Sequence, residues 1–420
     1  ADLAKKECRR LTDFPGPETE PRWSPDGRWI AFLTQTVPDI EFAETDVSII
    51  PADGGAPRNL TADVPRGVEQ FEWLSPGEIL LLEADGLYTR PCLLAVPTRA
   101  VTVLDPGPWN YTAVGRGRGG PAWFLRSGRA TLPEIVSWSP GAGFQARSQF
   151  SRQLAGFRLA GRRVVRWQGP GGLPIEGLLT LPPDYQFGTA VPLVVTAHGG
   201  PYDRYTDTLL QYEPMEDLAA QGWAVLAPNV RGSSGYDDAF GQANRYDLGG
   251  GDFGDLMAGV DSLVAAGIAD PDRLGIVGGS FGGFMVNWAI THTPRFRAAV
   301  SMFGIWSLFT DFGNSEQPCW EKMFTGKYYW EPGGIEAWLA KSPMSAATAV
   351  KTPVLILHGE EDTLTDRANS REMWQALRLM GRTVEYVRYP GESHGLSGRP
   401  GTRLDVTRRT LEWLGKYLKK

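Results

Sequence analysis

Residues 274–284 constrain the fold more than any other stretch of the chain. The stretch opens with apolar residues that suit a buried strand and continues as Gly278-Gly279-Ser280-Phe281-Gly282-Gly283, after which residues 284–290 contain no glycine or proline. This order predicts a strand, a sharp turn that exposes Ser280, and a helix that opens just after it. Glycines suit such a turn, because a Cβ would block the close backbone approaches that it needs. Ser280 is therefore the candidate nucleophile, and a glycine-rich loop is the alternative interpretation.

Length and composition limit the class of protein. A chain of 420 residues exceeds the size at which one hydrophobic core keeps growing, so we expect two domains. The net charge of -6 argues against nucleic acid as the main partner. No apolar run is long enough to span a membrane, and residues 1–10 lack the apolar segment of a secretory signal. Cys8, Cys92 and Cys319 form no Cys-x-x-Cys motif, which fits a reducing cytoplasm.

The first 155 residues contain a repeat. Arg10-Leu11-Thr12 recurs as Asn59-Leu60-Thr61, and Trp23-Ser24-Pro25-Asp26-Gly27 is echoed by Trp73-Leu74-Ser75-Pro76-Gly77. Both spacings are about 50 residues, close to the length of one four-stranded propeller blade. The segments within each unit are short and rich in β-forming residues, and turn residues such as Pro-Asp-Gly separate them. We therefore predict a partial β-propeller of about three blades over residues 1–155.

Three blades cannot close a ring by themselves. Propellers have about four to eight blades, and each blade packs between two neighbours. The chain is thus expected to be a fragment, a cleaved product, or a protomer that completes its β domain with another subunit as a homo-oligomer.

Residues 156–420 alternate strands with helices. Continuously apolar strands are predicted near residues 191–197 and 224–227 and again just before Ser280, and helical spacing of apolar residues appears at 256–268 and 411–418. Such alternation predicts a mainly parallel sheet with helices on both faces and with chemistry at the carboxyl ends of its strands. Together with the turn at Ser280, it predicts an α/β-hydrolase fold.

A serine hydroxyl needs a base to take its proton, and the base needs an acid to orient it. In the α/β-hydrolase order the acid and then the histidine follow the serine. Strand 353–357 ends in His358-Gly359-Glu360-Glu361-Asp362, and strand 384–389 ends in a loop that contains His394. We assign Asp362 as the orienting acid and His394 as the general base.

Other residues compete for these roles. Glu360 and Glu361 are close enough in sequence to replace Asp362, and a surface carboxylate is the alternative for all three. His358 is interpreted as a hydrogen-bonded histidine at a strand end. His292 falls at the predicted C-terminus of the helix after Ser280, where a cationic imidazole suits the helix dipole, so we interpret it as structural.

The oxyanion of an acyl-transfer reaction needs two pre-aimed donors. One expected donor is the backbone N–H of Phe281, directly after the nucleophile. The other is the N–H of Gly200 in His198-Gly199-Gly200-Pro201, which follows an early strand; an ordinary tight turn is the alternative there. Chemistry of this kind needs no metal or organic cofactor, and none is expected.

These motifs together resemble the prolyl oligopeptidase family of serine peptidases, and most closely its acylaminoacyl-peptidase branch. The resemblance spans nearly all of the second domain. Its main motifs are His198-Gly-Gly-Pro201, Asn229-Val-Arg-Gly-Ser-Ser-Gly-Tyr236, Gly278-Gly-Ser-Phe-Gly-Gly283, His358-Gly-Glu-Glu-Asp362 and Tyr389-Pro-Gly-Glu-Ser-His394.

The resemblance implies a propeller in front of the hydrolase domain that admits short peptides rather than folded proteins. It also implies the triad Ser280, Asp362 and His394. Two departures are visible. The prolyl-specific and dipeptidyl branches have a tyrosine where this chain has His198, so a backbone donor must serve the oxyanion here. Family members usually have about seven blades, so the N-terminal part of this chain is expected to be cut short. This bears on how the propeller would restrict substrate access rather than on the chemistry.

The expected function is hydrolysis of short peptides, acylaminoacyl peptides or oligopeptides, through an acyl-enzyme. A carboxylesterase with the same triad is the alternative, and a β-repeat binding module on an inactive scaffold is a third reading. Phe303 and Trp306 are candidates for an apolar pocket or for plain core. Arg231 either meets a substrate carbonyl or carboxylate, or forms an ion pair with Asp252 or Asp255.

Overall fold

The structure is a computed structural model that describes residues 8–35, 44–117, 119–317 and 319–419. It forms two compact units. The first runs to Phe157 and also includes Thr206–Leu210 and Ser234–Gln242, two segments from much later in the chain. The second contains the other residues from Arg158 onward. Each unit is described by itself below.

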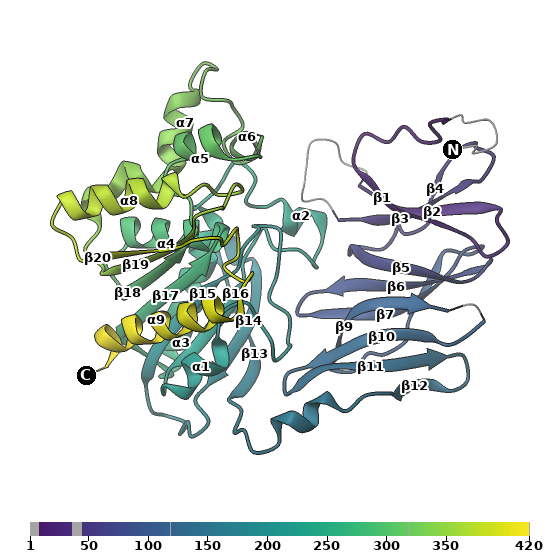
Figure 1. The fold of residues 1–420 in the computed structure, drawn as a ribbon, viewed down its shortest axis with the longest axis horizontal. Coiled ribbons are helices and arrows are strands. Elements are labelled where there is room, and N and C mark those ends of the chain that lie inside the picture. Colours follow the sequence, from purple (N-terminus) through teal and green to yellow (C-terminus); the bar gives the residue numbers. More distant parts are fainter. Residues whose placement is uncertain (1–7, 36–43, 118, 318, 420) are drawn as a thin grey trace. The chain divides into compact units, whose positions relative to one another are not determined.

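The first unit is built from three four-stranded antiparallel sheets (Figure 1). The strands of the first are β1 (Glu18–Trp23), β2 (Trp29–Thr34), β3 (Asp46–Pro51) and β4 (Arg58–Asn59). Those of the second are β5 (Val68–Ser75), β6 (Glu78–Asp85), β7 (Tyr88–Ala95) and β8 (Ala100–Val103). Those of the third are β9 (Asn110–Arg116), β10 (Ala122–Gly128), β11 (Thr131–Ser139) and β12 (Gly143–Ala146). The predicted propeller-like β domain is thereby confirmed.

The middle sheet is covered on both faces. Successive side chains of a strand point to opposite faces, so Ile79 and Leu81 of β6 pack in the cluster shared with the first sheet. Leu80 and Leu82 pack in the cluster shared with the third sheet. All four side chains are fully buried. The stacking of blades on one another therefore supplies the core of this unit.

The second unit contains an eight-stranded sheet in the order β13-β14-β16-β15-β17-β18-β19-β20. β13 and β14 are antiparallel to their neighbours, whereas the strands from β16 to β20 run parallel. This is the predicted mainly parallel sheet. The strands are β13 (Gly161–Gln168), β14 (Pro174–Leu181), β15 (Val191–Ala197), β16 (Ala224–Asn229), β17 (Ala269–Gly279), β18 (Phe296–Met302), β19 (Val354–Gly359) and β20 (Val384–Tyr389).

Helices cover both faces of this sheet (Figure 1). A Cβ on Gly275 of β17 would lie against Leu414 and Leu418, whereas one on Gly278 would meet the carbonyl of Gly282. Because the two glycines are three residues apart on one strand, they face opposite sides. The α-helices of the chain are α1 (Met215–Ala220), α2 (Asp238–Gly241, in the first unit), α3 (Gly251–Ala265), α4 (Phe281–His292), α5 (Leu308–Asn314), α6 (Trp320–Thr325), α7 (Gly334–Lys341), α8 (Ala368–Leu379) and α9 (Pro400–Leu418). The 3-10 helices are η1 (Phe150–Leu154), η2 (Pro170–Gly172) and η3 (Pro343–Ala349).

Cys8, Cys92 and Cys319 are free cysteines that form no disulfide, and Cys92 is buried. In the part of the chain that the structure describes, no helix combines the length and the apolar character that crossing a membrane requires.

Candidate active site

Ser280 lies in the turn between β17 and α4, as the sequence predicts. Its φ of 58° and ψ of -124° are strained for a residue with a side chain. Two backbone hydrogen bonds hold it there: its N–H donates to Met302 O (3.0 Å), and its carbonyl accepts from the N–H of Phe284 (2.9 Å). The turn therefore presents the serine at the carboxyl end of the central strand.

Two glycines of the turn allow α4 to begin so close to the sheet. A Cβ on Gly282 would lie 2.0 Å from the carbonyl oxygen of Ala197, at the end of β15. A Cβ on Gly283 would lie 2.6 Å from the Cα of Gly304, just after β18. Both contacts are with backbone, which cannot move aside easily. The spacing of glycines around Ser280 thus fixes the helix against the ends of two neighbouring strands.

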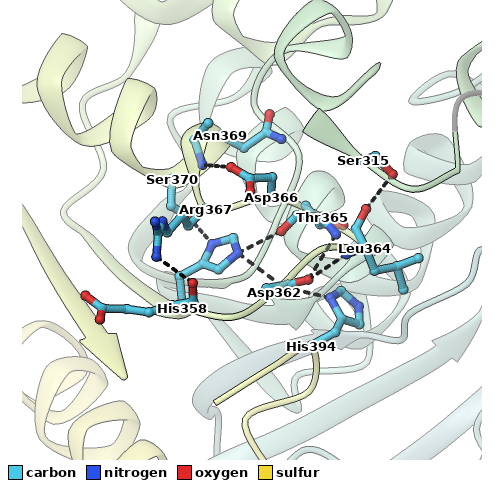
Figure 2. A network of polar contacts seen from close by, with 12 residues as sticks. Ser315, His358, Asp362, Leu364, Thr365, Asp366, Arg367, Asn369, Ser370 and His394 are labelled. Carbon is cyan, nitrogen blue, oxygen red and sulfur yellow. Dashed lines mark hydrogen bonds and ion pairs between the residues drawn. The ribbon is translucent and has the colours of Figure 1, made fainter. Parts of the chain in front are cut away.

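His394 and Asp362 come together in the loops after β20 and β19. His394 Nδ1 lies 2.8 Å from Asp362 Oδ2 (Figure 2). The other oxygen, Oδ1, accepts from the backbone N–H groups of Leu364 (3.0 Å) and Thr365 (3.1 Å). The Asp362 side chain is fully buried, whereas that of His394 is 23% exposed. The carboxylate accepts at Nδ1, so the Nδ1–H tautomer is favoured and Nε2 is left free to accept a proton.

Burial and hydrogen bonding act on Asp362 in opposite directions. Burial raises the pKa of the carboxyl, but the hydrogen bonds from His358 and His394 outweigh it and lower the pKa to about 2. Asp362 is therefore ionised at neutral pH. The rival carboxylates lie elsewhere: Glu360 pairs with Arg388 (3.2 Å), and Glu361 is exposed.

His358 is a buried neighbour of the same carboxylate. Its Nε2 lies 2.8 Å from Thr365 O and 3.2 Å from Asp362 Oδ2, and its Nδ1 lies 2.7 Å from Ser370 Oγ. The histidine is hydrogen-bonded at a strand end, in keeping with the sequence analysis. Its contact with Asp362 was missed, although the spacing of four residues across the turn after β19 was available as a signal.

Phe303 connects the serine turn to His394. Its ring centroid lies 4.7 Å from that of His394, and a Cβ on Gly279 would lie 2.6 Å from its Cζ. Phe303 therefore touches the residue before Ser280 and the imidazole at once. Its backbone has a φ of 37°, held by a hydrogen bond from its N–H to Leu357 O (2.8 Å).

Tyr212 ties down the loop that carries His394. Its hydroxyl donates to the carbonyl of Gly395 (2.8 Å), and its ring meets that of Phe303 edge to face at 6.1 Å. The ring is also close to Gly279, since a Cβ there would lie 3.4 Å from Tyr212 Cε1. No pattern around Tyr212 in the sequence signals this role, because its partners are remote along the chain.

The loop after β15 reaches the side of Ser280. A Cβ on Gly199 would lie 3.6 Å from the Cβ of Ser280. Gly200 has a φ of 103°, and a Cβ there would lie 2.5 Å from Tyr202 N, so glycine is required. Phe281 is the first residue of α4, and its N–H is one of those that the helix itself leaves unused.

His198 forms a hydrogen bond with the backbone of this glycine loop. Its Nδ1–H donates to Gly199 O (2.8 Å), and its Nε2 lies 3.0 Å from Ser233 Oγ. Burial lowers the pKa of His198, although the charge of Asp203 acts to raise it. The imidazole is therefore neutral and acts as a hydrogen-bonding brace for the backbone of the loop.

The remaining candidates have local partners. The Arg231 guanidinium lies 2.7 and 2.8 Å from the two oxygens of Asp255, which matches the ion-pair alternative, with Asp255 rather than Asp252. Trp306 is 1% exposed, which fits the core alternative for that residue. Among the described residues, no three His, Cys, Asp or Glu side chains are grouped so that they could hold a metal ion.

The chain is similar to known proteins in sequence and in fold. A model of the prolyl oligopeptidase family matches residues 213–420. The chain is 35% identical over 257 residues to the uncharacterized peptidase YuxL of Bacillus subtilis, which covers 60% of this chain and 39% of that protein. It is 30% identical over 412 residues to dipeptidyl-peptidase 5 of Porphyromonas gingivalis, which covers 96% of this chain and 60% of that protein.

The fold is also similar to a solved structure, that of Pyrococcus horikoshii acylaminoacyl peptidase. The TM-score is 0.85 at 24% identity, over 94% of this chain and 62% of the other. The chain thus spans less than two thirds of the length of each of these three proteins. Residues 213–420, which include Ser280, Asp362 and His394, thus belong to the prolyl oligopeptidase family.

Proposed function

We propose that the protein is a serine peptidase that hydrolyses short peptides through an acyl-enzyme on Ser280. The observation that carries the proposal is the 2.8 Å hydrogen bond from His394 Nδ1 to the buried, ionised Asp362. It orients the imidazole, which shares the Phe303 ring with the turn of Ser280. The proposed nucleophile, acid and base thus follow one another along the chain in the α/β-hydrolase order.

In the proposed reaction the Ser280 hydroxyl attacks the scissile carbonyl while His394 Nε2 takes its proton. The N–H groups of Phe281 and Gly200 bind the oxyanion of the tetrahedral intermediate. His394 then gives the proton to the leaving amine, which leaves an ester between the substrate acyl group and Ser280. Water attacks this ester with His394 again as base, and Asp362 stays ionised throughout.

Acylaminoacyl peptides are the first candidate substrates. The supporting feature is His198-Gly199-Gly200-Pro201, in which a glycine N–H rather than a tyrosine hydroxyl is available for the oxyanion. Release of dipeptides from a free amino terminus is the second candidate, because one relative is named dipeptidyl-peptidase 5. Both candidates use the same triad and differ only in how the substrate's amino end is bound.

The test compares the protein with its Ser280→Ala variant on acetyl-alanine anilide, on free dipeptidyl anilides and on a short p-nitrophenyl ester. We expect Ser280→Ala to lose hydrolysis of every substrate by at least about 10⁴-fold, because the nucleophile is absent. A fluorophosphonate probe should label the parent protein and leave the variant unlabelled.

Each other outcome selects a different function. Cleavage of free dipeptidyl anilides with blocked substrates surviving would replace the acylaminoacyl assignment by the dipeptidyl one. Ester hydrolysis with no peptide cleaved would favour a carboxylesterase. Absence of labelling in the folded parent protein would contradict the hydrolase proposal and favour a binding module.

A further inference from the structure

The Asp362 carboxylate receives two imidazoles on one oxygen. His394 Nδ1 lies 2.8 Å and His358 Nε2 lies 3.2 Å from Oδ2, and Figure 2 shows both rings directed at the carboxylate. The mechanism proposed above uses only His394. His358 is fully buried and cannot meet a substrate.

The partners of His358 determine where its hydrogen lies. Nε2 faces the carbonyl of Thr365 at 2.8 Å and the ionised carboxylate of Asp362, and both of these groups only accept. Nε2 must therefore carry the hydrogen. In the neutral ring with its hydrogen on Nε2, Nδ1 accepts, and the Ser370 hydroxyl 2.7 Å away can donate to it. The two acceptors at Nε2 thus fix this tautomer, and Ser370 satisfies the other ring nitrogen.

His358 and the loop backbone fix the carboxylate from three sides. The N–H groups of Leu364 and Thr365 hold Oδ1, while His358 Nε2, which donates to Thr365 O, also lies 3.2 Å from Oδ2. A carboxylate without these donors could rotate about χ2, and the direction of its bond to His394 would change. Burial raises the pKa of Asp311, and the charge of Asp362 raises it further.

We infer that His358 is a positioning residue, oriented by the acceptors at Nε2 and by Ser370 at Nδ1, and that it holds Asp362 so that the acid keeps His394 aligned with Ser280. This inference rests on the proposed function, because alignment matters only if the triad is used. It separates His358 from an ordinary buried histidine, whose loss would affect stability without a specific effect on turnover.

The test uses variants of similar size. His358→Gln keeps an amide N–H near the position of Nε2, whereas His358→Leu removes the donor. We expect His358→Leu to lower kcat about ten- to a hundredfold with KM nearly unchanged, since a hydrogen bond to a charged group is lost away from the substrate. His358→Gln should stay within a fewfold of the parent. Ser370→Ala should lower kcat about three- to tenfold, because Nδ1 loses its hydrogen-bond partner and the ring is held less firmly.

A spectroscopic readout accompanies the rates. The downfield proton resonance of the hydrogen bond between His394 and Asp362 should shift or broaden in His358→Leu and in Ser370→Ala. The matched control is Thr352→Val, which removes a different buried hydrogen bond, from Thr352 Oγ1 to Phe296 O (2.9 Å). It should leave both kcat and the resonance as in the parent protein.

The outcomes separate the two proposals. If the parent protein is active and Ser280→Ala is inactive, but folded His358→Leu keeps full kcat and the resonance, only the positioning role is wrong. If His358→Leu does not fold, an unchanged kcat and resonance in Ser370→Ala overturns it instead. If Ser280→Ala is as active as the parent, the proposed function itself fails.

Discussion

Asp362 is the residue whose environment decides most about the site. A carboxylate at this position must stay charged in a buried place, and the donors that surround it make that possible. Glu360 and Glu361 are nearly adjacent in sequence but are directed at other partners or at solvent. Within this loop, the hydrogen-bond partners of a carboxylate therefore identify the candidate acid better than its residue type does.

Replacement of the acid gives a sharp prediction. In Asp362→Asn we expect kcat to fall by about 10⁴-fold with little change in KM, because an amide favours the wrong tautomer of His394. Steady-state kinetics on the best substrate of the panel above measures this. Glu361→Gln is the control and should keep parental kinetics. Equal activities of the two variants would remove Asp362 from the proposed mechanism.

The sequence predicts some of these residues and not others. Ser280, Asp362 and His394 are proposed from motif and chain order, because each follows a strand whose pattern is visible. Tyr212 is missed because its contact with Gly395 depends on how two loops meet in space. The contact of His358 with Asp362 is missed although the two residues lie four apart in one turn. The alternatives for Arg231 could be separated only once Asp255 was seen to reach it.

The turn from β17 into α4 is the element on which the site is built. Gly282→Ala would bring a Cβ to 2.0 Å from Ala197 O, so the helix must move or the strand end must give way. We expect a loss of at least about 3 kcal/mol in the free energy of unfolding, of the size seen for severe overpacking.

The control for this prediction is Gly313→Ala in α5, where a Cβ meets nothing within 4 Å. There alanine should raise the free energy of unfolding by up to about 1 kcal/mol, because glycine is a poor helix former. Urea unfolding of both variants measures the difference. A Gly282→Ala protein as stable as the parent would show that the strand end is not fixed as described.

Strands with a local sequence pattern are predictable, but the burial of their side chains is less so. The repeat gives matching tryptophans near the end of β1 and within β5, yet Trp23 is 61% exposed and Trp73 is 3% exposed. Trp73 Nε1 donates to Arg22 O of the first sheet, so its burial comes from a neighbouring blade. The tryptophans of two similar segments thus have different environments, which only the stacking of sheets distinguishes.

At the scale of the whole molecule, buried carboxyls make stability depend on pH. Burial raises the pKa of Glu213, Asp252 and Asp311 to about 7 and that of Glu321 to about 8. After burial, the charge of Asp311 also raises the pKa of Glu321. Within the described part of the chain, neither oxygen of Glu321 has a hydrogen-bond partner.

Raised carboxyl pKa values make the folded protein less stable as pH rises. Between about pH 4 and their folded pKa values of about 7 to 8, the folded protein keeps protons on these groups that the unfolded chain has released, so the free energy of unfolding falls as pH rises. Asp362 acts in the opposite sense, but its contribution is lost only as pH falls from about 4 towards its folded pKa of about 2.

Glu321→Gln tests this account. The amide is neutral at every pH and is buried without losing a proton, so we expect a flatter stability profile and a more stable protein at pH 8 than the parent. Chemical unfolding at several pH values measures it. Glu336→Gln, an exposed change on α7, should leave the profile as it is. A Glu321→Gln profile identical to the parental one would mean that Glu321 is ionised throughout.

The chain passes from one unit to the other after residues 157, 205, 210, 233 and 242, which affects the outcome of proteolytic cleavage. A nick at residue 157 would not release an independent β piece, because the Thr206–Leu210 and Ser234–Gln242 segments would remain tethered to the other polypeptide. Arg129 would lose its bidentate partner, the buried Asp207, if that segment were withdrawn. Cleaved protein should therefore stay together on a sizing column under native conditions and separate only in denaturant.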